Sequence, residues 1–304
     1  MQIGITGVEI DSLNKEVADL TKCIKAEGHE VKIMYSDALG MEIGRQGVKM
    51  YHARSRPSGS GSDKELLDPD AVLLRHLGII RDYEQFTYRL WCIRALELSG
   101  ITVMNPLMNW LMASDKLATS IVLSKNKLPI PDTASTEQMF MAYESAKKFR
   151  VSVVKPLRSA MGFGVFRIDN ADIGMHIFSY FTNLSKPIYV QKYLVKEGGG
   201  DYRVVVVNGE AIGAEFRKGI NWKSNVSQGA RPIKARMDKE LSELAVKASE
   251  ALGLDYAGID IAKTKEGYCI LETNPTLSWQ GFKSVTGINP AEYIVRHLIE
   301  KARS

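Results

Sequence analysis

The sequence predicts a mixed α/β protein that opens with a parallel sheet and continues in a β-rich α+β arrangement. In residues 1–105, short β-branched runs alternate with helical patterns, the rhythm of a parallel sheet flanked by helices. Beyond Pro106 the elements are richer in strands. Near the end, two apolar strands carry acidic residues late in their runs. These observations together favour two or three parts rather than one simple sheet.

The first part contains alternating strands and helices. Strands are predicted at residues 2–6, 30–35, 70–75 and 101–105, and helices at residues 12–27 and 82–99. The second helix should end before Gly100, because glycine readily takes the left-handed conformation that follows many helices. The segment 40–62 is rich in Gly, Ser and Arg and is interpreted as a loop. A domain boundary is placed near Pro106.

Turn residues and helix-capping residues predict the elements of the second and third parts. Ser114 can cap a helix to about residue 125, and residues 128–132 form an extended linker because two prolines exclude a helix. The remaining expected helices are 136–149, 171–183, 238–252 and one from Pro290, and the remaining strands include 151–155, 165–168 and 188–194. The Asn208 and Gly209 pair predicts a tight hairpin.

Composition limits the possible functions. The chain has 304 residues, 45% hydrophobic and 25% charged, with a net charge of +5. No charge block is long enough for a nucleic-acid arm, and no apolar run approaches the ~20 residues needed to cross a bilayer. The cysteines, Cys23, Cys92 and Cys269, are odd in number and far apart, which favours free thiols. We therefore expect a cytoplasmic protein with no membrane or nucleic-acid partner.

The most informative residues are Asp260, Glu272 and Asn274, which stand late in two apolar strands. Glu272 and Asn274 are two residues apart, so their side chains should share one face of their strand. Three oxygen-bearing side chains on neighbouring strands suit magnesium, a hard ion that keeps waters and phosphates in its other positions. The alternative is that these carboxylates end their strands facing solvent.

Two further groups of residues suggest phosphate chemistry. Lys155 ends a strand and precedes a loop that contains Gly162 and Gly164, where backbone amides could approach a phosphate. This loop fits neither a Rossmann fingerprint nor a P-loop, and an ordinary turn is the alternative. Several cations, including Arg203 and Arg217, come shortly before Asp260 and Glu272 in the sequence. Phosphoryl transfer requires cations near acidic metal ligands, because the charge on the phosphoryl group must be neutralised. A solvated basic hairpin is the alternative for these cations.

The order of these motifs resembles the ATP-grasp superfamily, and within it the RimK-like glutamate ligases, from about Arg75 to the end of the chain. This resemblance implies an ATP-grasp fold with a parallel-sheet pre-ATP-grasp domain at 1–105, a lid subdomain at 106–190 and a C-terminal catalytic subdomain at 191–304. Residues 188–194 resemble the hinge segment whose backbone reads adenine. Residues 159–165 resemble the loop that folds over the phosphates.

The resemblance also implies roles for individual residues. It implies that nucleotide is bound by Lys116, Lys155, Gly162, Gly164, Gln191, Lys192, Tyr193, Leu194 and Asp201. It implies that Arg217, Arg203 and Asn225 act near the transferring phosphoryl group and the substrate. It implies that Asp260, Glu272 and Asn274 hold Mg²⁺ or Mn²⁺, with two metal ions expected.

The chain also departs from the pattern of the ribosomal-protein-modifying members. Lys223 replaces their usual arginine, and the loop after it differs, which argues against a ribosomal protein substrate. Residues 276–289 are more similar to the archaeal ligases that add glutamate to the pterin coenzyme tetrahydromethanopterin. The implied activity is ATP-dependent amide formation through an acyl-phosphate, with small-molecule partners: ATP, an amino acid and a carboxylate acceptor. A homo-oligomer is compatible with the resemblance.

Several alternatives stay open at this point. Other possible acceptors are a carrier protein, a deazaflavin coenzyme or a protein C-terminus. A nucleotide-binding regulatory module without ligase activity is a non-enzyme alternative, which the metal residues and both lysines argue against. A nucleic-acid-binding protein that uses residues 45–56 rests on modest basicity alone. Arg75 and Tyr83 are candidate contacts for the acceptor, and Trp279 could stack on a substrate ring or pack in the core.

Overall fold

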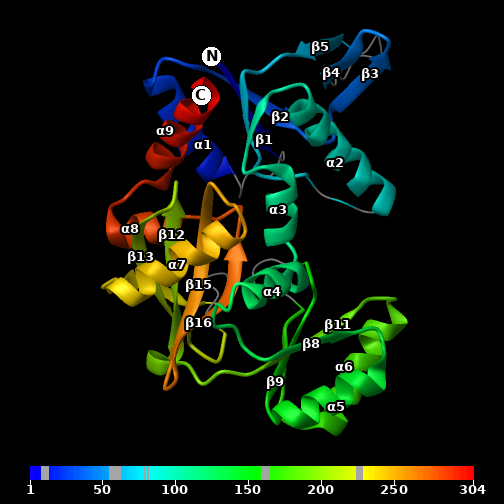
Figure 1. Ribbon diagram of the computed structural model, residues 1–304, viewed down its shortest axis with the longest axis vertical. Coiled ribbons are helices and arrows are strands. Elements are labelled where there is room, and N and C mark those ends of the chain that lie inside the picture. The colour runs from blue at the N-terminus through cyan, green and yellow to red at the C-terminus, as the bar shows by residue number, and fades with distance from the viewer. Residues whose placement is uncertain (8–13, 55–62, 79, 81, 159–163, 224–228) are drawn as a thin grey trace. The chain divides into compact units, whose positions relative to one another are not determined.

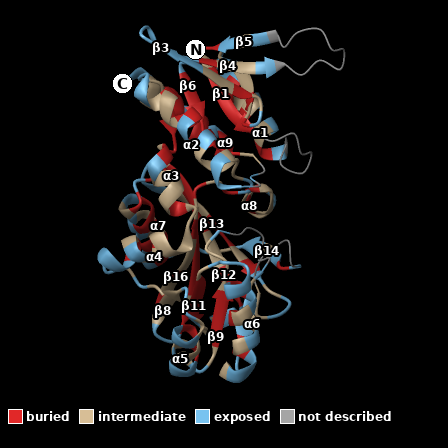
Figure 2. Cartoon of the chain, turned by 90° about the vertical axis from the view of Figure 1, so that its right-hand side faces the viewer, coloured by how far each residue is buried: buried red, intermediate tan, exposed pale blue. Residues whose placement is uncertain are grey.

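A computed structural model describes residues 1–7, 14–54, 63–78, 80, 82–158, 164–223 and 229–304. The chain forms two compact units. The first comprises Met1–Trp110, Ser278–Gln280 and Asn289–Ser304, and the second comprises Leu111–Leu277 and Gly281–Ile288. The three-part division expected at residues 105 and 190 stays a prediction. Figure 1 labels the elements, and Figure 2 shows buried strands beneath more exposed helices.

The first unit is built on a four-stranded sheet of order β2-β1-β6-β7, and all of its neighbouring strands are parallel, as the sequence predicted. Its strands are β1 Gln2–Gly7, β2 Glu30–Tyr35, β6 Ala71–Leu73 and β7 Thr102–Met104. Its helices include α1 Asn14–Ala26, α2 Tyr83–Leu98 and α9 Pro290–Arg303. Asp82 caps α2 by accepting from the Gln85 amide, and Gly100 follows the helix with φ +85°, which confirms the expected end.

The segment from residue 40 onward corrects the sequence interpretation. Instead of a loop, it contains an antiparallel sheet of β3 Leu39–Gly44, β4 Gly47–Arg54 and β5 Asp63–Leu67. Leu39, Met50 and Leu67 join the core that α2 also lines, and the alternation of apolar residues at this spacing turns one face of the sheet inward. Gly44 and Gly47 lie where β3 ends and β4 begins, and Gly40 lies within β3. Residues 55–62 lie outside the described part.

A short segment from late in the chain is anchored in the first unit. Trp279 is fully buried, and its Nε1 donates to Asp19 on α1 at 3.1 Å. Ser278 donates to Glu16 at 2.6 Å. The Arg75 guanidinium lies 4.8 Å from the Trp279 ring centroid, in a cation–π contact. Trp279 therefore serves packing, and the ring-stacking alternative is not supported.

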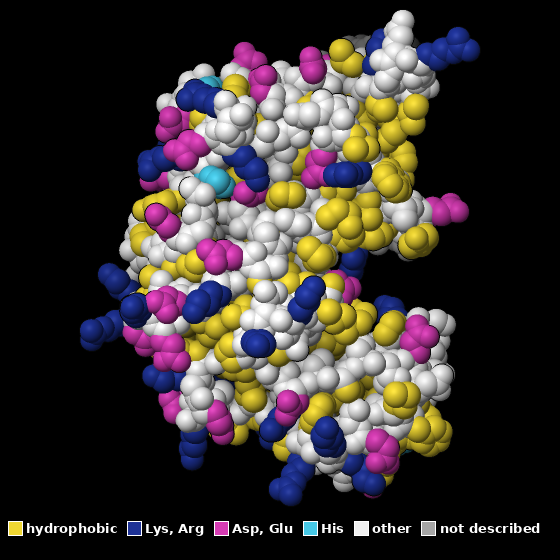
Figure 3. Space-filling model, viewed as in Figure 1, with side chains coloured by type: hydrophobic (Ala, Val, Ile, Leu, Met, Phe, Trp, Pro, Cys, Tyr) yellow, Lys and Arg dark blue, Asp and Glu magenta, His cyan; other side chains and the backbone are white. Residues whose placement is uncertain are grey.

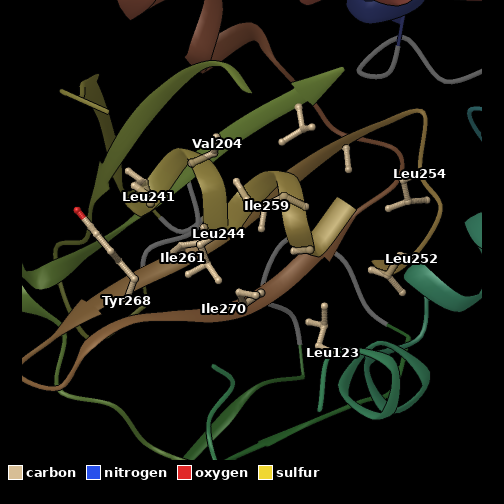
Figure 4. Packing of buried hydrophobic residues seen from close by; sticks show 14 of the residues in the cluster. Leu123, Val204, Leu241, Leu244, Leu252, Leu254, Ile259, Ile261, Tyr268 and Ile270 are labelled. Carbon is tan, nitrogen blue, oxygen red and sulfur yellow. The ribbon is translucent and has the colours of Figure 1, made fainter. Parts of the chain in front are cut away.

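The second unit contains a five-stranded antiparallel sheet of order β14-β13-β12-β15-β16. Its strands are β12 Gly200–Val207, β13 Glu210–Lys218, β14 Arg231–Lys234, β15 Tyr256–Thr264 and β16 Gly267–Asn274. Helix α7 Lys239–Ala251 covers one face, and Figure 4 shows Leu241 and Leu244 against Ile259 and Ile261. The predicted hairpin joins β12 to β13, with Asn208 at φ +51° and Gly209 at φ +71°.

A smaller sheet of order β10-β9-β11-β8 completes this unit. Its strands are β8 Thr133–Thr136, β9 Ser152–Lys155, β10 Phe166–Ile168 and β11 Ile188–Lys192, with helices α5 Met139–Phe149 and α6 Ala171–Asn183. Helix α5 begins three residues later than predicted because Thr136 belongs to β8. The remaining helices are α3 Leu107–Ala113, α4 Lys116–Lys125 and α8 Gln280–Thr286. Asp115, rather than Ser114, caps α4.

Two other expectations concern side chains and surfaces. Cys23, Cys92 and Cys269 all carry thiols, as expected. On the face shown in Figure 3, Lys and Arg side chains are interspersed with Asp and Glu. No helix in the described ranges has the length and apolarity that crossing a membrane would require.

The packing of α7 on the large sheet yields a stability prediction. Ile259 is 0% exposed in this core, so Ile259→Ala should lower the free energy of unfolding by about 2–5 kcal/mol. Ile233 on β14 is 46% exposed, so Ile233→Ala should cost about 1 kcal/mol or less. Chemical denaturation of both variants measures the difference. Equal losses would contradict this assignment of the core.

Candidate active site

The face of the large sheet that points away from α7 carries the charged residues. On β12, Val204 and Val206 pack in the α7 core, so Asp201 and Arg203 project from the opposite face. On β15, Ile259 and Ile261 pack in the same core, so Asp260 between them also faces away from α7. The antiparallel register places Arg203 directly opposite Asp260 and Arg217 opposite Asp201.

A β-bulge on β16 brings Glu272 to the same face. Ile270 pairs with Ile261 and belongs to the α7 core, whereas Glu272 pairs with Asp260. Leu271 is therefore the extra residue, and past it the alternation of the strand is reversed. Without this bulge, Glu272, two residues from Ile270, would point into the core. Asn274 follows on the face of Glu272, and its Nδ2 lies 3.4 Å from Asp260 Oδ2.

Asp260 is the centre of a buried ion-pair network. Arg203 donates to both carboxylate oxygens of Asp260, from Nε and Nη2, each at 2.8 Å. Arg217 bridges Asp201 and Asp260, at 2.6 and 2.8 Å from its Nη2. Burial opposes the charge on Asp260, but the two arginines outweigh it and lower the pKa of Asp260 to about 2. Burial likewise opposes the charge on Arg217, yet Asp260 and Asp201 raise its pKa.

Two lysines lie beside this network. Lys116, the first residue of α4, is 3.0 Å from Glu272 Oε1, and Lys155, at the end of β9, donates to Gln191 Oε1 at 2.7 Å. Burial lowers the pKa of Lys155 to about 8, with further lowering from Lys116 and Lys196 and an opposing effect of Glu272. Lys196, which was not predicted from the sequence, lies 3.6 Å from Asp201.

The expected hinge segment comprises the end of β11 and the residues after it. Gln191 is buried, and its Nε2 donates to the Tyr189 hydroxyl at 3.2 Å, so its side chain positions Lys155. The backbone amides of Lys192 and Tyr193 donate to the carbonyls of Asp132 and Val151, at 2.8 and 2.9 Å. The Tyr193 ring has Arg167 4.6 Å from its centroid and Trp222 edge-on at 6.4 Å.

The acidic residues form a donor set that fits magnesium. Asp260, Glu272 and Asn274 bring two carboxylates and one amide to adjacent strands, and hard oxygen donors are what Mg²⁺ prefers. In the described residues, no group of three or more His, Cys, Asp or Glu side chains could hold a metal. The protein would therefore supply few ligands and leave the other positions to water and phosphates, as Mg²⁺ sites commonly do.

Not every predicted site residue can be placed. Gly162 and Asn225 lie outside the described residues. Gly164 has φ +69°, and a Cβ there would lie 2.9 Å from Pro156, so the position requires glycine. Leu194 is partly buried just beyond β11. The roles assigned to all these residues stay predictions.

The structure also reveals Glu215, which the sequence analysis missed. This carboxylate lies on the site face of β13, directly opposite Arg203. It is 3% exposed, and burial raises its pKa, although Arg203 and Arg217 act in the other direction. The available signal was its position two residues before Arg217, which puts both side chains on one face of a strand.

Solved structures similar to this chain include ATP-grasp proteins. A RimK-domain ATP-grasp protein from Sphaerobacter thermophilus matches with a TM-score of 0.74 and 19% identity, over 98% of this chain and 100% of that one. The ATP-grasp ligase PsnB, in complex with a minimal precursor, Mg and ADP, matches with a TM-score of 0.72 and 20% identity, over 99% and 98%. The fold is thus the ATP-grasp fold expected from the sequence.

Sequence comparison identifies the family. A RimK-like ATP-grasp domain model matches residues 113–298, so the chain belongs to the RimK-like ATP-grasp family. A tetrahydromethanopterin:α-L-glutamate ligase of Methanocaldococcus jannaschii is 36% identical, over 79% of this chain and 83% of that protein. The Methanosarcina acetivorans protein of that name is 31% identical, over 77% and 81%. A probable α-L-glutamate ligase of Marinomonas is 28% identical, over 90% and 88%.

Family membership settles the general class of the protein. It is an enzyme, a ligase of the acid–amino-acid type, and ATP and Mg²⁺ are the cofactors of this class. The sequence resemblance is confirmed on these points. Membership in a ligase family argues against the alternative of a nucleotide-binding regulatory module without ligase activity.

With Lys155 as a phosphate contact, as the sequence predicts, its lowered pKa predicts how ATP binding depends on pH. Protonated Lys155 can pair with phosphate, but above pH 8 the free enzyme loses that proton. The Kd for ATP should therefore rise above pH 8, by up to about tenfold per pH unit. Lys155→Arg keeps its charge throughout and should give a flat profile from pH 7 to 9. Calorimetric titration measures both, and parallel profiles would contradict the assignment.

Proposed function

We propose that this enzyme adds L-glutamate to a carboxylate of tetrahydromethanopterin, forming an amide at the expense of ATP. The observation that carries the proposal is the similarity to the Methanocaldococcus jannaschii ligase of that name, at 36% identity over 79% of the chain. Two further relatives with the same name, from Methanosarcina acetivorans and Methanococcus maripaludis, support it. The partners are then small molecules: ATP, glutamate and the pterin.

In this proposal the lysines hold the nucleotide. Lys116 and Lys155 contact the phosphates, and the loop that ends at Gly164 covers them. Gln191 keeps Lys155 in place through the 2.7 Å hydrogen bond. The base lies against residues 191–194, and the amides of Lys192 and Tyr193 already donate within the sheet, so other backbone groups of the segment read adenine. Asp201 acts through Arg217 and Lys196.

Asp260, Glu272 and Asn274 would hold magnesium, with two ions proposed. Bound there, Mg²⁺ would supply charge neutralisation for the phosphates. The chain's own contribution is to fix two arginines beside the reacting groups. Arg217 is held on two sides, by Asp201 and Asp260, so it is already oriented before substrates bind. Asn225 is proposed to contact substrate.

The proposed reaction has two steps, formation of an acyl-phosphate and its capture by an amine. The acceptor carboxylate attacks the γ-phosphorus of ATP, the bond to the β-phosphate oxygen breaks, and Arg217 offsets the charge that develops on the phosphoryl group. The α-amine of glutamate attacks the resulting acyl-phosphate, phosphate leaves with the electron pair of the C–O bond, and the amine gives up a proton. The products are ADP, phosphate and the amide. Exclusion of water protects the acyl-phosphate from hydrolysis.

ADP release by the purified protein tests the proposal. With ATP, Mg²⁺ and L-glutamate present, tetrahydromethanopterin should stimulate release, and the deazaflavin coenzyme, a carrier protein and peptides ending in glutamate should not. Product mass should increase by one glutamyl residue or more. Stimulation by another acceptor alone would replace the pterin in the proposal.

A matched pair of variants tests the metal residues. Glu272→Ala should reduce turnover by about 100-fold or more, because it removes a carboxylate on which phosphate neutralisation depends. Glu266→Ala makes the same change at an exposed position of the same hairpin and should leave turnover unchanged. Equal effects of the two substitutions would remove Glu272 from the metal site.

A further inference from the structure

Four charged side chains form one row across the large sheet. The register pairs Glu215 with Arg203, Arg203 with Asp260, and Asp260 with Glu272, on strands β13, β12, β15 and β16. Directly paired residues of antiparallel strands project on the same face, with Cβ atoms about 4.5–5.5 Å apart. Arg203 therefore lies between two carboxylates. It bonds to Asp260 with both ends of its guanidinium fork.

Glu215 is incompletely bonded for a buried carboxylate. Glu215 is 3% exposed, and its Oε2 is buried with no hydrogen-bond partner among the described residues. Leaving a buried acceptor without a partner is costly, and native structures contain few such groups. Glu215 thus has an acceptor oxygen available beside Arg203, which Asp260 holds. This arrangement suggests that Glu215 is a second binding position for the Arg203 guanidinium.

The acidic site supplies a reason for the arginine to move. Arg203 uses both oxygens of Asp260, and Arg217 shares Oδ2. A divalent cation on Asp260 would compete for the same lone pairs and would repel both guanidinium groups. Arg217 has Asp201 as a second carboxylate partner. For Arg203, Glu215 is the carboxylate directly across the neighbouring strand.

We propose that Glu215 receives the guanidinium of Arg203 when a divalent cation occupies Asp260, so that Glu215 sets how readily the site takes up its metal. Glu215 is thus a positioning residue that acts through Arg203. The inference rests on the proposed function only in placing the metal at Asp260, and it is independent of which acceptor the enzyme uses. The exchange transfers one ion pair from Asp260 to Glu215 and keeps Arg203 paired in both states.

Binding of Mn²⁺ in the presence of ADP, followed by electron paramagnetic resonance, tests this without any turnover. Glu215→Gln removes the receiving charge, so Mn²⁺ affinity should fall by roughly tenfold or more, the equivalent of one charged hydrogen bond. Glu215→Asp keeps the charge on a shorter side chain and should recover part of the affinity. Glu210→Gln, at the exposed start of β13, is the matched control and should bind as the wild type does.

A double-mutant cycle separates this role from a structural one. In an Arg203→Gln background there is no guanidinium to transfer, so Glu215→Gln should change Mn²⁺ affinity less than about twofold. Wild-type affinity in Glu215→Gln, or the same loss in both backgrounds, would overturn the proposal. If the wild type binds no Mn²⁺ with ADP, the inference fails together with the metal site. If Mn²⁺ binds but the pterin is not glutamylated, only the proposed substrate fails.

Discussion

The site depends on the pairing of Asp260 with Arg203 and Arg217. Asp260 and Arg217 are buried and Arg203 is half-buried, and these charges are tolerated only because each is paired and hydrogen-bonded, since an unpaired buried ion costs several kcal/mol. On the site face, these ion pairs fix the positions of β12, β13 and β15 relative to one another. On the other face, the apolar core against α7 fixes the same positions. Ion pairs and apolar packing therefore both hold the strands that carry the site residues in place.

The same network explains how one sheet can offer both a rigid and an adjustable element. Arg217 is held between Asp201 and Asp260, so it keeps a carboxylate partner whatever happens at Asp260. Arg203 binds Asp260 with its guanidinium fork, and the neighbouring Glu215 has an acceptor oxygen with no partner in the part of the chain that the structure describes. A phosphoryl-transfer site needs fixed cations as well as a place for a metal, and in the proposed mechanism Arg217 serves the first need and Arg203 the second.

The position of Glu272 shows how a small irregularity decides chemistry. Strand alternation alone would put Glu272 on the side of Ile270, inside the apolar core, where an unpaired carboxylate would be costly. The bulge at Leu271 reverses the alternation and places Glu272 beside Asp260 and Lys116. Residues 278–280, which begin four positions beyond Asn274, belong to the first unit and bond there to Glu16 and Asp19 of α1.

The sequence alone determined the parallel sheet, most helices and the convergence of Asp260 with Asn274, because these follow from local periodicity and turn residues. It missed the β3–β5 sheet, because its strands contain glycines that read as a loop, and it missed Glu215, because a lone glutamate in a strand looks solvent-facing. Only the tertiary structure decided the bulge at Leu271 and the partners of each arginine. Those depend on cross-strand register, which arises from pairing between distant segments and cannot be read from local pattern.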